Sequence, residues 1–195
     1  MISGIVLAAG AAERMGRQKL LLDLKGKPVL QWTLEAALGS KLDEVVCVVR
    51  HLKEIQQTIS LKHRKLRWVT NEKAAEGQST SIIAGLKAVS PGSEAAVFLV
   101  GDQPLVKPDL ITGLIDLFLQ NDPSIVAPSL QGQARNPVLF HKDLFPELLQ
   151  LTGDRGGRGL IDKHRPRLAL LEWKDETAFL DVDVWEDYER LKRFR

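Results

Sequence analysis

Short runs of apolar, mostly β-branched residues alternate along this chain with longer segments of helical periodicity. The runs cover residues 2–7, 45–49, 95–100 and 125–127, and a weaker one covers 66–69. Strands that are apolar along their whole length are buried on both faces, so they occupy central positions in a sheet covered by helices. Alternation with helices is typical of βαβ units around a parallel sheet. The sequence therefore predicts an α/β fold with a mostly parallel central sheet.

The segments between and after these runs have the period of a helix. Two of them begin at prolines, Pro28 and Pro108, and proline is preferred at the first helical position. Between Ala127 and Leu139 the pattern weakens, and this segment is predicted to be a loop or hairpin that either carries substrate contacts or is a plain surface connection. The predicted helices cover residues 28–38, 52–59, 79–89, 108–119, 142–151, 155–163 and 185–194.

Length and composition exclude several classes of protein. A chain of 195 residues predicts one domain covering 1–195, and 44% apolar with 27% charged residues is the balance of a soluble globular protein. A net charge of +2 is too small to drive general nucleic-acid binding. No apolar run is long enough to span a bilayer, and the N-terminus lacks the basic leading region of a signal peptide. We therefore expect a cytoplasmic protein with neither a nucleic acid nor a membrane as partner.

The first apolar run opens into the loop LAAGAAERMGRQK, residues 7–19. Neither the GxGxxG pattern nor the Walker pattern is present. The small residues from Ala8 to Ala12 would let backbone N–H groups approach an anion closely, and Arg14 and Lys19 would add charge suited to a triphosphate. The alternative is a tight turn with surface cations.

Acidic residues follow two other segments. Asp102 comes directly after the strand predicted at 95–100, where a carboxylate needs a cation, and in a phosphate cleft that cation is Mg²⁺. The alternative is that Asp102 caps the turn before Pro104. In FLDVDVWEDY, Asp181 or Asp183 could complete the metal site, although for Asp181 we favour a role at the N-terminus of the following helix.

Taken together, the sequence resembles the nucleotidyltransferases that handle molybdenum cofactor, a family that includes molybdopterin-guanine dinucleotide synthases, and most closely the molybdenum cofactor cytidylyltransferases. LAAGAAERMGRQKLLL is similar to the family's LAAG-x-S-x-RMG-x-x-KLLL. The segments that follow in the family's order are NEKAAEGQSTSIIAGL, FLVGDQP, NPVLF, LTGDRGGRGLI and FLDVDVWEDY, so the resemblance covers nearly the whole chain.

The resemblance implies a Rossmann-like, three-layer α/β/α fold in which Arg14, Lys19 and Asp102 are catalytic and Asp102 and Asp183 hold Mg²⁺. It implies that the nucleotide is bound by Leu7, Ala8, Ala9, Gly10, Arg14, Lys19, Gly77, Gln78 and Ser81, the last three beside the base. It implies that the pterin substrate is received by Asn136, Pro137, Asp154, Arg155 and Gly157.

The chain departs from the family's pattern at three places. Ala12 stands where the family often has a serine, Ala134-Arg135 replaces the usual residues before Asn136-Pro137, and Val184-Trp185 replaces Thr-Pro. The second departure concerns the segment that would receive the pterin. Relatives that transfer GMP have LAGG where this chain has LAAG, so Ala9 is typical of the cytidylyl version, in which a methyl group narrows the pocket for a pyrimidine.

The resemblance implies transfer of CMP from CTP to the terminal phosphate of molybdopterin, with release of pyrophosphate. The product could pass to a molybdoenzyme or its chaperone. The alternatives are transfer of GMP from GTP to the same cofactor, transfer to another phosphorylated acceptor such as a sugar phosphate or methylerythritol phosphate, and a non-catalytic carrier of the cofactor.

Overall fold

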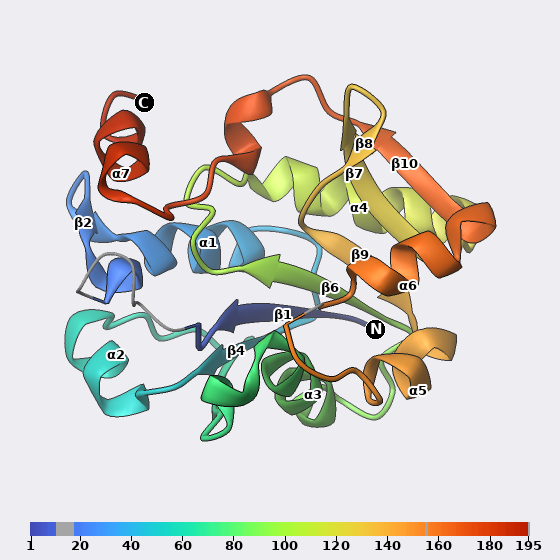
Figure 1. Cartoon of the computed structure of the whole chain (residues 1–195), viewed down its shortest axis with the longest axis horizontal. Helices are drawn as coiled ribbons and strands as arrows, with labels where there is room; N and C mark the ends of the chain where they lie inside the picture. The colour runs from blue at the N-terminus through green and yellow to red at the C-terminus, as the bar shows by residue number, and fades with distance from the viewer. Residues whose placement is uncertain (11–17, 155, 195) are drawn as a thin grey trace.

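An eight-stranded sheet is the middle layer of the protein, in a computed structural model that describes residues 1–10, 18–154 and 156–194 (Figure 1). Its strands are β1 (Ile2–Ala8), β4 (Glu44–Val49), β5 (Leu66–Thr70), β6 (Ala95–Val100), β7 (Ile125–Leu130), β8 (Gln133–Ala134), β9 (Val138–His141) and β10 (Leu168–Glu172). The order across the sheet is β10-β7-β9-β6-β1-β4-β5, and β8 pairs with β7. Within this sheet only β9 and β8 run against their neighbours. The predicted α/β fold with a mostly parallel sheet is confirmed.

Helices cover both faces of the sheet (Figure 1). They are α1 (Val29–Leu38), α2 (Leu52–Thr58), α3 (Gln78–Ala88), α4 (Pro108–Asn121), α5 (Phe145–Leu148), α6 (Arg158–Lys163) and α7 (Trp185–Leu191). Buried residues of α1, α2 and α4 belong to one apolar cluster, and those of α3, α5 and α6 belong to another on the opposite face. No helix in the described part of the chain is long and apolar enough to cross a lipid bilayer.

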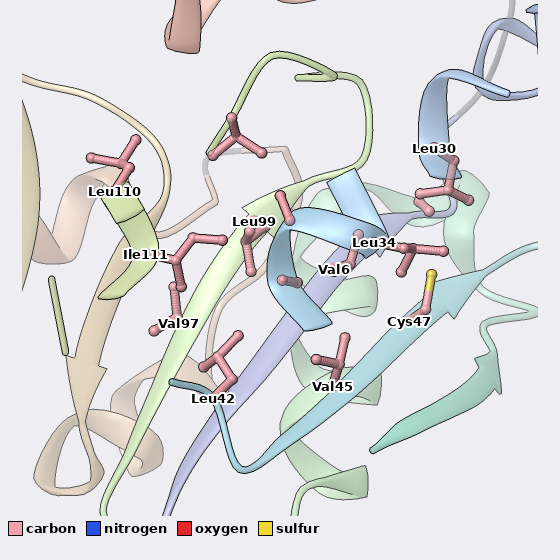
Figure 2. Close-up of a cluster of buried hydrophobic side chains, with 14 of the residues drawn as sticks. Val6, Leu30, Leu34, Leu42, Val45, Cys47, Val97, Leu99, Leu110 and Ile111 are labelled. Carbon is pink, nitrogen blue, oxygen red and sulfur yellow. The ribbon is translucent and has the colours of Figure 1, made fainter. Parts of the chain in front are cut away.

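The first apolar cluster anchors the central strands. Side chains of α1 and α4, including Leu34 and Ile111, pack against those of β1, β4 and β6 (Figure 2). Cys47 lies within this cluster as a small side chain with no exposed surface. Burial raises the pKa of its thiol, which keeps it protonated and unreactive.

Helix α3 approaches the sheet unusually closely. A Cβ atom added at Gly85 would collide with the side chain of Ile5, so only glycine allows this approach. The helix also packs on β4 and β5. As a result, its first turn lies at the edge where the parallel strands have their carboxyl ends, the place where open α/β sheets bind ligands.

The structure confirms one irregular segment and corrects other predicted elements. The segment predicted as a loop or hairpin, 127–139, contains a hairpin, in which the end of β7 pairs antiparallel with β8, and the start of β9 follows. Strand β10 was not predicted, because as an edge strand with three partly exposed and two exposed residues it lacks a continuous buried run. The helix predicted over 142–151 is a 3₁₀ turn, η3 (Lys142–Leu144), followed by the short α5.

The start of the first predicted helix also differs. Pro28 lies in β3 (Lys27–Pro28), which pairs with β2 (Asp23–Leu24), and α1 begins one residue later at Val29. Pro108 is the first residue of α4, as predicted. Three further 3₁₀ turns that bear on the site are η1 (Lys19–Leu21), η2 (Ala74–Glu76) and η5 (Glu176–Phe179).

Candidate active site

Two adjoining cavities open at the carboxyl edge of the parallel strands. The first, which we name the β1 cavity, has a volume of about 430 Å³; the second, the β9 cavity, has about 400 Å³. Four residues line both: Leu7, Gln78, Val100 and Asp154. The two cavities are therefore neighbours across the end of β1, the end of β6 and the start of α3.

Small residues and the ends of regular elements form the β1 cavity. Strand β1 contributes its last residues, and Gly10, which also lines the cavity, has no side chain to cover its backbone there. The first turn of α3 and the turn η2 form the opposite side. The residues that line only this cavity are Ala8, Ala9, Gly10, Lys19, Leu20, Arg50, Ala74, Ala75, Gly77, Ser81 and Asp102.

Lys19 links two carboxylates that are far apart in the sequence. Its Nζ donates hydrogen bonds to Asp102 Oδ2 at 2.6 Å and to Asp183 Oδ1 at 2.9 Å. Lys19 is the first residue of η1, Asp102 lies just beyond β6, and Asp183 lies just before α7. Burial opposes the charge of Lys19, but the two carboxylates outweigh this and raise its pKa above the ordinary value, so the ammonium stays protonated.

The segment that carries Asp183 is held by backbone contacts. The N–H of Val182 donates to the carbonyl of Asp102 at 3.0 Å, and the side chain of Val182 is fully buried. Beyond it, Asp187 Oδ2 accepts from the N–H groups of Asp183 and Val184, each at 3.1 Å. These contacts fix the carboxylate of Asp183 beside the end of β6.

The start of α3 is joined to the loop before α6. Gln78 N donates to Asp154 Oδ1 at 3.1 Å, and Ser79 N donates to the carbonyl of Gly153 at 3.1 Å. Gly77 has φ of +115°, a conformation that non-glycine residues rarely adopt, and an added Cβ atom would lie 2.6 Å from the carbonyl carbon of Gly153. Gly77 therefore allows the contact that connects the two cavities.

The β9 cavity has an apolar floor and a polar rim. Phe98 and Phe140, whose ring centroids are 5.7 Å apart, are part of the floor. Arg135 and Arg158 supply positive charge at the rim. The remaining residues that line only this cavity are Ile82, Gln103, Ala134, Asn136, Val138, Leu148, Gly156, Gly157, Ile161, Phe179 and Asp181.

Asp181 faces the β9 cavity rather than the Lys19 ammonium. Partial desolvation by the surrounding protein, together with the charges of Asp102 and Asp183, raises the pKa of Asp181 to about 6 despite a hydrogen bond with Gln103. It precedes α7 by four residues, so the role that we favoured for it at the helix N-terminus is not the one that its position indicates. Asp183 is the partner that joins Asp102 at Lys19.

The structure thus distributes the predicted residues over both cavities. Leu7, Ala8, Ala9, Gly10, Lys19, Gly77, Gln78, Ser81 and Asp102 line the β1 cavity, Asp183 contacts Lys19 there, and Asn136, Asp154 and Gly157 line the β9 cavity. Pro137 is buried behind Asn136 and does not line either cavity. Arg14 and Arg155 lie outside the described residues.

Sequence reasoning missed several residues that line the cavities. Arg50 directly follows β4, so a charged residue at the carboxyl end of a predicted strand was a usable signal. Arg158 lies in the quoted segment LTGDRGGRGLI but was not singled out. Gln103 and Phe179 also lie in quoted segments, FLVGDQP and FLDVDVWEDY, but no local pattern indicates that they line a cavity, because only the fold brings them there.

Comparison with known proteins identifies the family of this chain. A family model described as the MobA-like NTP transferase domain matches residues 4–168. The chain is 33% identical to the purine catabolism protein PucB of Bacillus subtilis over 97% of this chain and 95% of that protein. It is 28% identical to a probable molybdenum cofactor guanylyltransferase of Natranaerobius thermophilus over 99% of this chain and 96% of that protein.

A solved structure extends the comparison to the fold. Rv0371c from Mycobacterium tuberculosis, in complex with manganese, superposes with a TM-score of 0.80 at 28% identity and covers 100% of this chain and 99% of that chain. The expected Rossmann-like fold is thereby confirmed. The chain belongs to the family of MobA-like NTP transferase domains and is an enzyme of the nucleotidyltransferase type.

Proposed function

We propose that this protein is a magnesium-dependent cytidylyltransferase that transfers CMP from CTP to the terminal phosphate of molybdopterin and releases pyrophosphate. The observation that carries the proposal is the convergence of Lys19, Asp102 and Asp183 beside the β1 cavity, next to a second cavity for an acceptor. Attack on a triphosphate brings two anions together, so the reaction needs fixed positive charge and alignment at this point.

The residues present fit a divalent metal ion. Asp102 and Asp183 both reach the same ammonium nitrogen, so their oxygens converge on one position, and carboxylate oxygens are the ligands that Mg²⁺ prefers. No group of three or more His, Cys, Asp or Glu residues that could hold a metal ion occurs in the described ranges. Two carboxylates completed by substrate phosphates and water are a common Mg²⁺ arrangement. When bound, the ion would neutralise charge on the phosphates.

The chain's own residues supply the remaining functions. Lys19 would leave the two carboxylates when a metal ion replaces it and would then donate to phosphate oxygens. It would stay charged without the carboxylates, because the ordinary pKa of lysine, 10.5, lies well above neutral pH. The backbone from Ala8 to Gly10 would cradle the nucleotide. A phosphate monoester acceptor is largely ionised at neutral pH because its second pKa is about 6, so the attack requires no protein base.

The preference for CTP rests on the space beside Ala9. This residue is only 2% exposed and lines the β1 cavity, so its methyl group takes up room next to the backbone that would contact a base. One methyl group gives about 1–3 kcal/mol of discrimination, enough to favour a pyrimidine over a purine.

The preference for molybdopterin rests on the β9 cavity. Its floor includes Phe98 and Phe140, which suit a flat ring system, while Arg135 and Arg158 suit an anionic substituent. The probable guanylyltransferase relative also acts, by its name, on molybdenum cofactor. A small sugar phosphate would leave most of this apolar surface uncovered.

The test is to incubate the protein with molybdenum cofactor, Mg²⁺ and each of the four NTPs in turn, and to identify the product by mass. We expect a cytosine dinucleotide of the cofactor, with one pyrophosphate released per transfer. A guanine dinucleotide would overturn the choice of nucleotide. Transfer to methylerythritol phosphate but not to the cofactor would overturn the acceptor, and tight cofactor binding without any transfer would indicate a carrier.

A further inference from the structure

Asn71 is a buried amide that connects three segments around the β1 cavity without lining the cavity itself. It directly follows β5 and is 5% exposed. Its Nδ2 donates to Thr80 Oγ1 and to Ser81 Oγ, both at 2.9 Å, and its Oδ1 accepts from the N–H of Lys73 at 3.0 Å. The two hydroxyl groups belong to the first turn of α3.

The orientation of this amide follows from its partners. The backbone N–H of Lys73 can only donate, so the amide atom that faces it must be the oxygen. Thr80 Oγ1 lies 2.9 Å from the carbonyls of both Lys73 and Gly77, which can only accept, so the single proton of Thr80 is directed to one of them. The amide NH₂ group of Asn71 must therefore face the hydroxyl groups of Thr80 and Ser81.

Ser81 differs from Thr80 in where its proton can go. Its oxygen accepts from Asn71, and no acceptor for its proton is found among the described residues. The residue is 5% exposed and lines the β1 cavity. A buried hydroxyl group without an acceptor is costly, so its proton is available for an acceptor on whatever occupies the cavity.

We propose that Asn71 is a positioning residue that fixes the Ser81 hydroxyl group as a hydrogen-bond donor to the nucleobase, and that it thereby sets a preference for CTP over UTP. This inference rests on the proposed function. Cytosine presents a ring acceptor at N3, whereas uracil carries a proton there, so a fixed donor pairs with the first base and opposes the second. We expect a preference of roughly tenfold from this one contact.

The test measures the dissociation constants of CTP and UTP for the full chain by calorimetry, with Mg²⁺ and without an acceptor. In Asn71→Asp, the carboxylate still accepts from the N–H of Lys73 but can also accept from Ser81. The proton of Ser81 would then point to the new carboxylate instead of the base, and the Ser81 oxygen would face the base as an acceptor. The ratio of the UTP to the CTP dissociation constant should then fall about tenfold. Thr80→Val is the matched control, because it also loses a contact to Asn71 and should keep the wild-type ratio.

Asn71→Asp places a carboxylate oxygen against Thr80 Oγ1, whose only proton is directed to a backbone carbonyl. The two oxygens would repel each other, so this variant can fail to fold. Asn71→Ala is the second variant: it frees the Ser81 hydroxyl group to rotate, and the ratio should fall to between the wild-type value and that of Asn71→Asp. In a Ser81→Ala background, Asn71→Ala should change the ratio no further, since Asn71 acts through Ser81. A purely structural role would weaken binding of both nucleotides equally and leave the ratio unchanged.

The outcomes separate this inference from the proposed function. A wild-type ratio retained in folded Asn71→Asp or Asn71→Ala overturns the role of Asn71, and so does wild-type protein that binds CTP and UTP equally well. Tight, selective CTP binding without transfer to molybdopterin overturns the acceptor while the Asn71 result still stands. Wild-type protein that binds GTP more tightly than CTP overturns both.

Discussion

The β1 cavity and the β9 cavity share lining residues but are built differently. The β1 cavity lies at the carboxyl ends of parallel strands β1 and β6 and the first turn of α3, all parts of the regular winding. The β9 cavity lies over the reversed strand β9, the short strand β8 and the loop before α6. The comparison teaches that the cavity proposed for the nucleotide is built on the ends of regular strands and a helix, whereas the cavity proposed for the acceptor is built on a reversed strand, a short strand and a loop, which can vary with less effect on the core.

Replacement of Asp102 should have the largest effect, because it lines the β1 cavity and contacts the Lys19 ammonium together with Asp183. In Asp102→Asn, one of the two convergent carboxylates is lost, and we expect transfer to fall by about 10³-fold or more while CTP still binds. Asp102 is partly exposed and Asp183 still pairs with Lys19, so the free energy of unfolding should change by less than about 1 kcal/mol. Steady-state pyrophosphate release and urea denaturation measure the two quantities. Asp109→Asn, at the exposed start of α4, is the control; near-normal turnover of Asp102→Asn would remove Asp102 from the mechanism.

Replacement of Lys19 should separate phosphate binding from metal binding. In Lys19→Met, transfer should fall by roughly 10²-fold. Mn²⁺ should nevertheless bind the nucleotide-free protein about tenfold more tightly, since the internal cation no longer competes for Asp102 and Asp183. Electron paramagnetic resonance of free Mn²⁺ measures this affinity. Lys41→Met, which removes the exposed pair with Asp116, is the control; unchanged Mn²⁺ affinity in Lys19→Met would contradict competition at the two carboxylates.

The regular half of the molecule could be predicted from the sequence because local signals and tertiary structure agree there. Strands β1, β4 and β6 are apolar along most of their length, and each is buried on both faces. Asp102 could be singled out because a carboxylate after such a strand needs a cation. The pairing of Asp102 with Lys19 across 83 positions followed from no local pattern, and the family resemblance implied only that both residues belong to one site.

The other half could not be predicted, because its elements depend on tertiary contacts. β9 has only four residues and pairs antiparallel with both β6 and β7. No local pattern in so short a strand predicts its direction. β10 is an edge strand that exposes Leu170. In the sequence Asn71 is only the first residue of a segment that resembles the family, because the role that we propose for it depends on hydrogen bonds that only the fold reveals.

Gly77→Ala should damage both cavities at once. The added methyl group would meet Gly153 and would also strain a backbone with φ of +115°, at a cost of about 1–3 kcal/mol of stability. The start of α3 would move away from Asp154, so we expect CTP affinity and acceptor affinity each to fall by roughly tenfold or more. Calorimetry and acceptor titration measure these. Gly92→Ala, which has no neighbour within 4 Å, is the control; loss of CTP binding alone would show that the two cavities are not joined through Gly77.

Arg158→Ala should affect only the acceptor side. The side chain is exposed at the rim of the β9 cavity, where it would form a charge-assisted hydrogen bond with an anionic acceptor. We expect KM for the acceptor to rise about tenfold, with kcat and the affinity for CTP nearly unchanged. Arg165→Ala, on a turn away from either cavity, is the control. A rise in the dissociation constant of CTP would show that this rim also serves the nucleotide.

Glu44→Gln should change stability without changing catalysis, because Glu44 lies at the amino end of β4, opposite the active edge. Its Oε1 accepts from Ser3 Oγ at 2.7 Å and Ser90 N at 2.6 Å, and its Oε2 accepts from Arg67 at 2.7 Å. Burial raises the pKa of Glu44, but these hydrogen bonds to the ionised form outweigh burial and hold the pKa below its ordinary value of 4.5. The folded state therefore favours the carboxylate, so the stability that Glu44 contributes is present above pH 4.5 and is lost as the pH falls through the lowered pKa.

We expect Glu44→Gln to lower the free energy of unfolding by about 1–3 kcal/mol at pH 7, with kcat and both KM values unchanged. This difference in the free energy of unfolding should shrink as the pH is lowered below about 4. Urea denaturation at a series of pH values measures this, with the exposed Glu54→Gln as control, and a difference that stays constant with pH would show that the charge of Glu44 does not stabilise this half of the sheet.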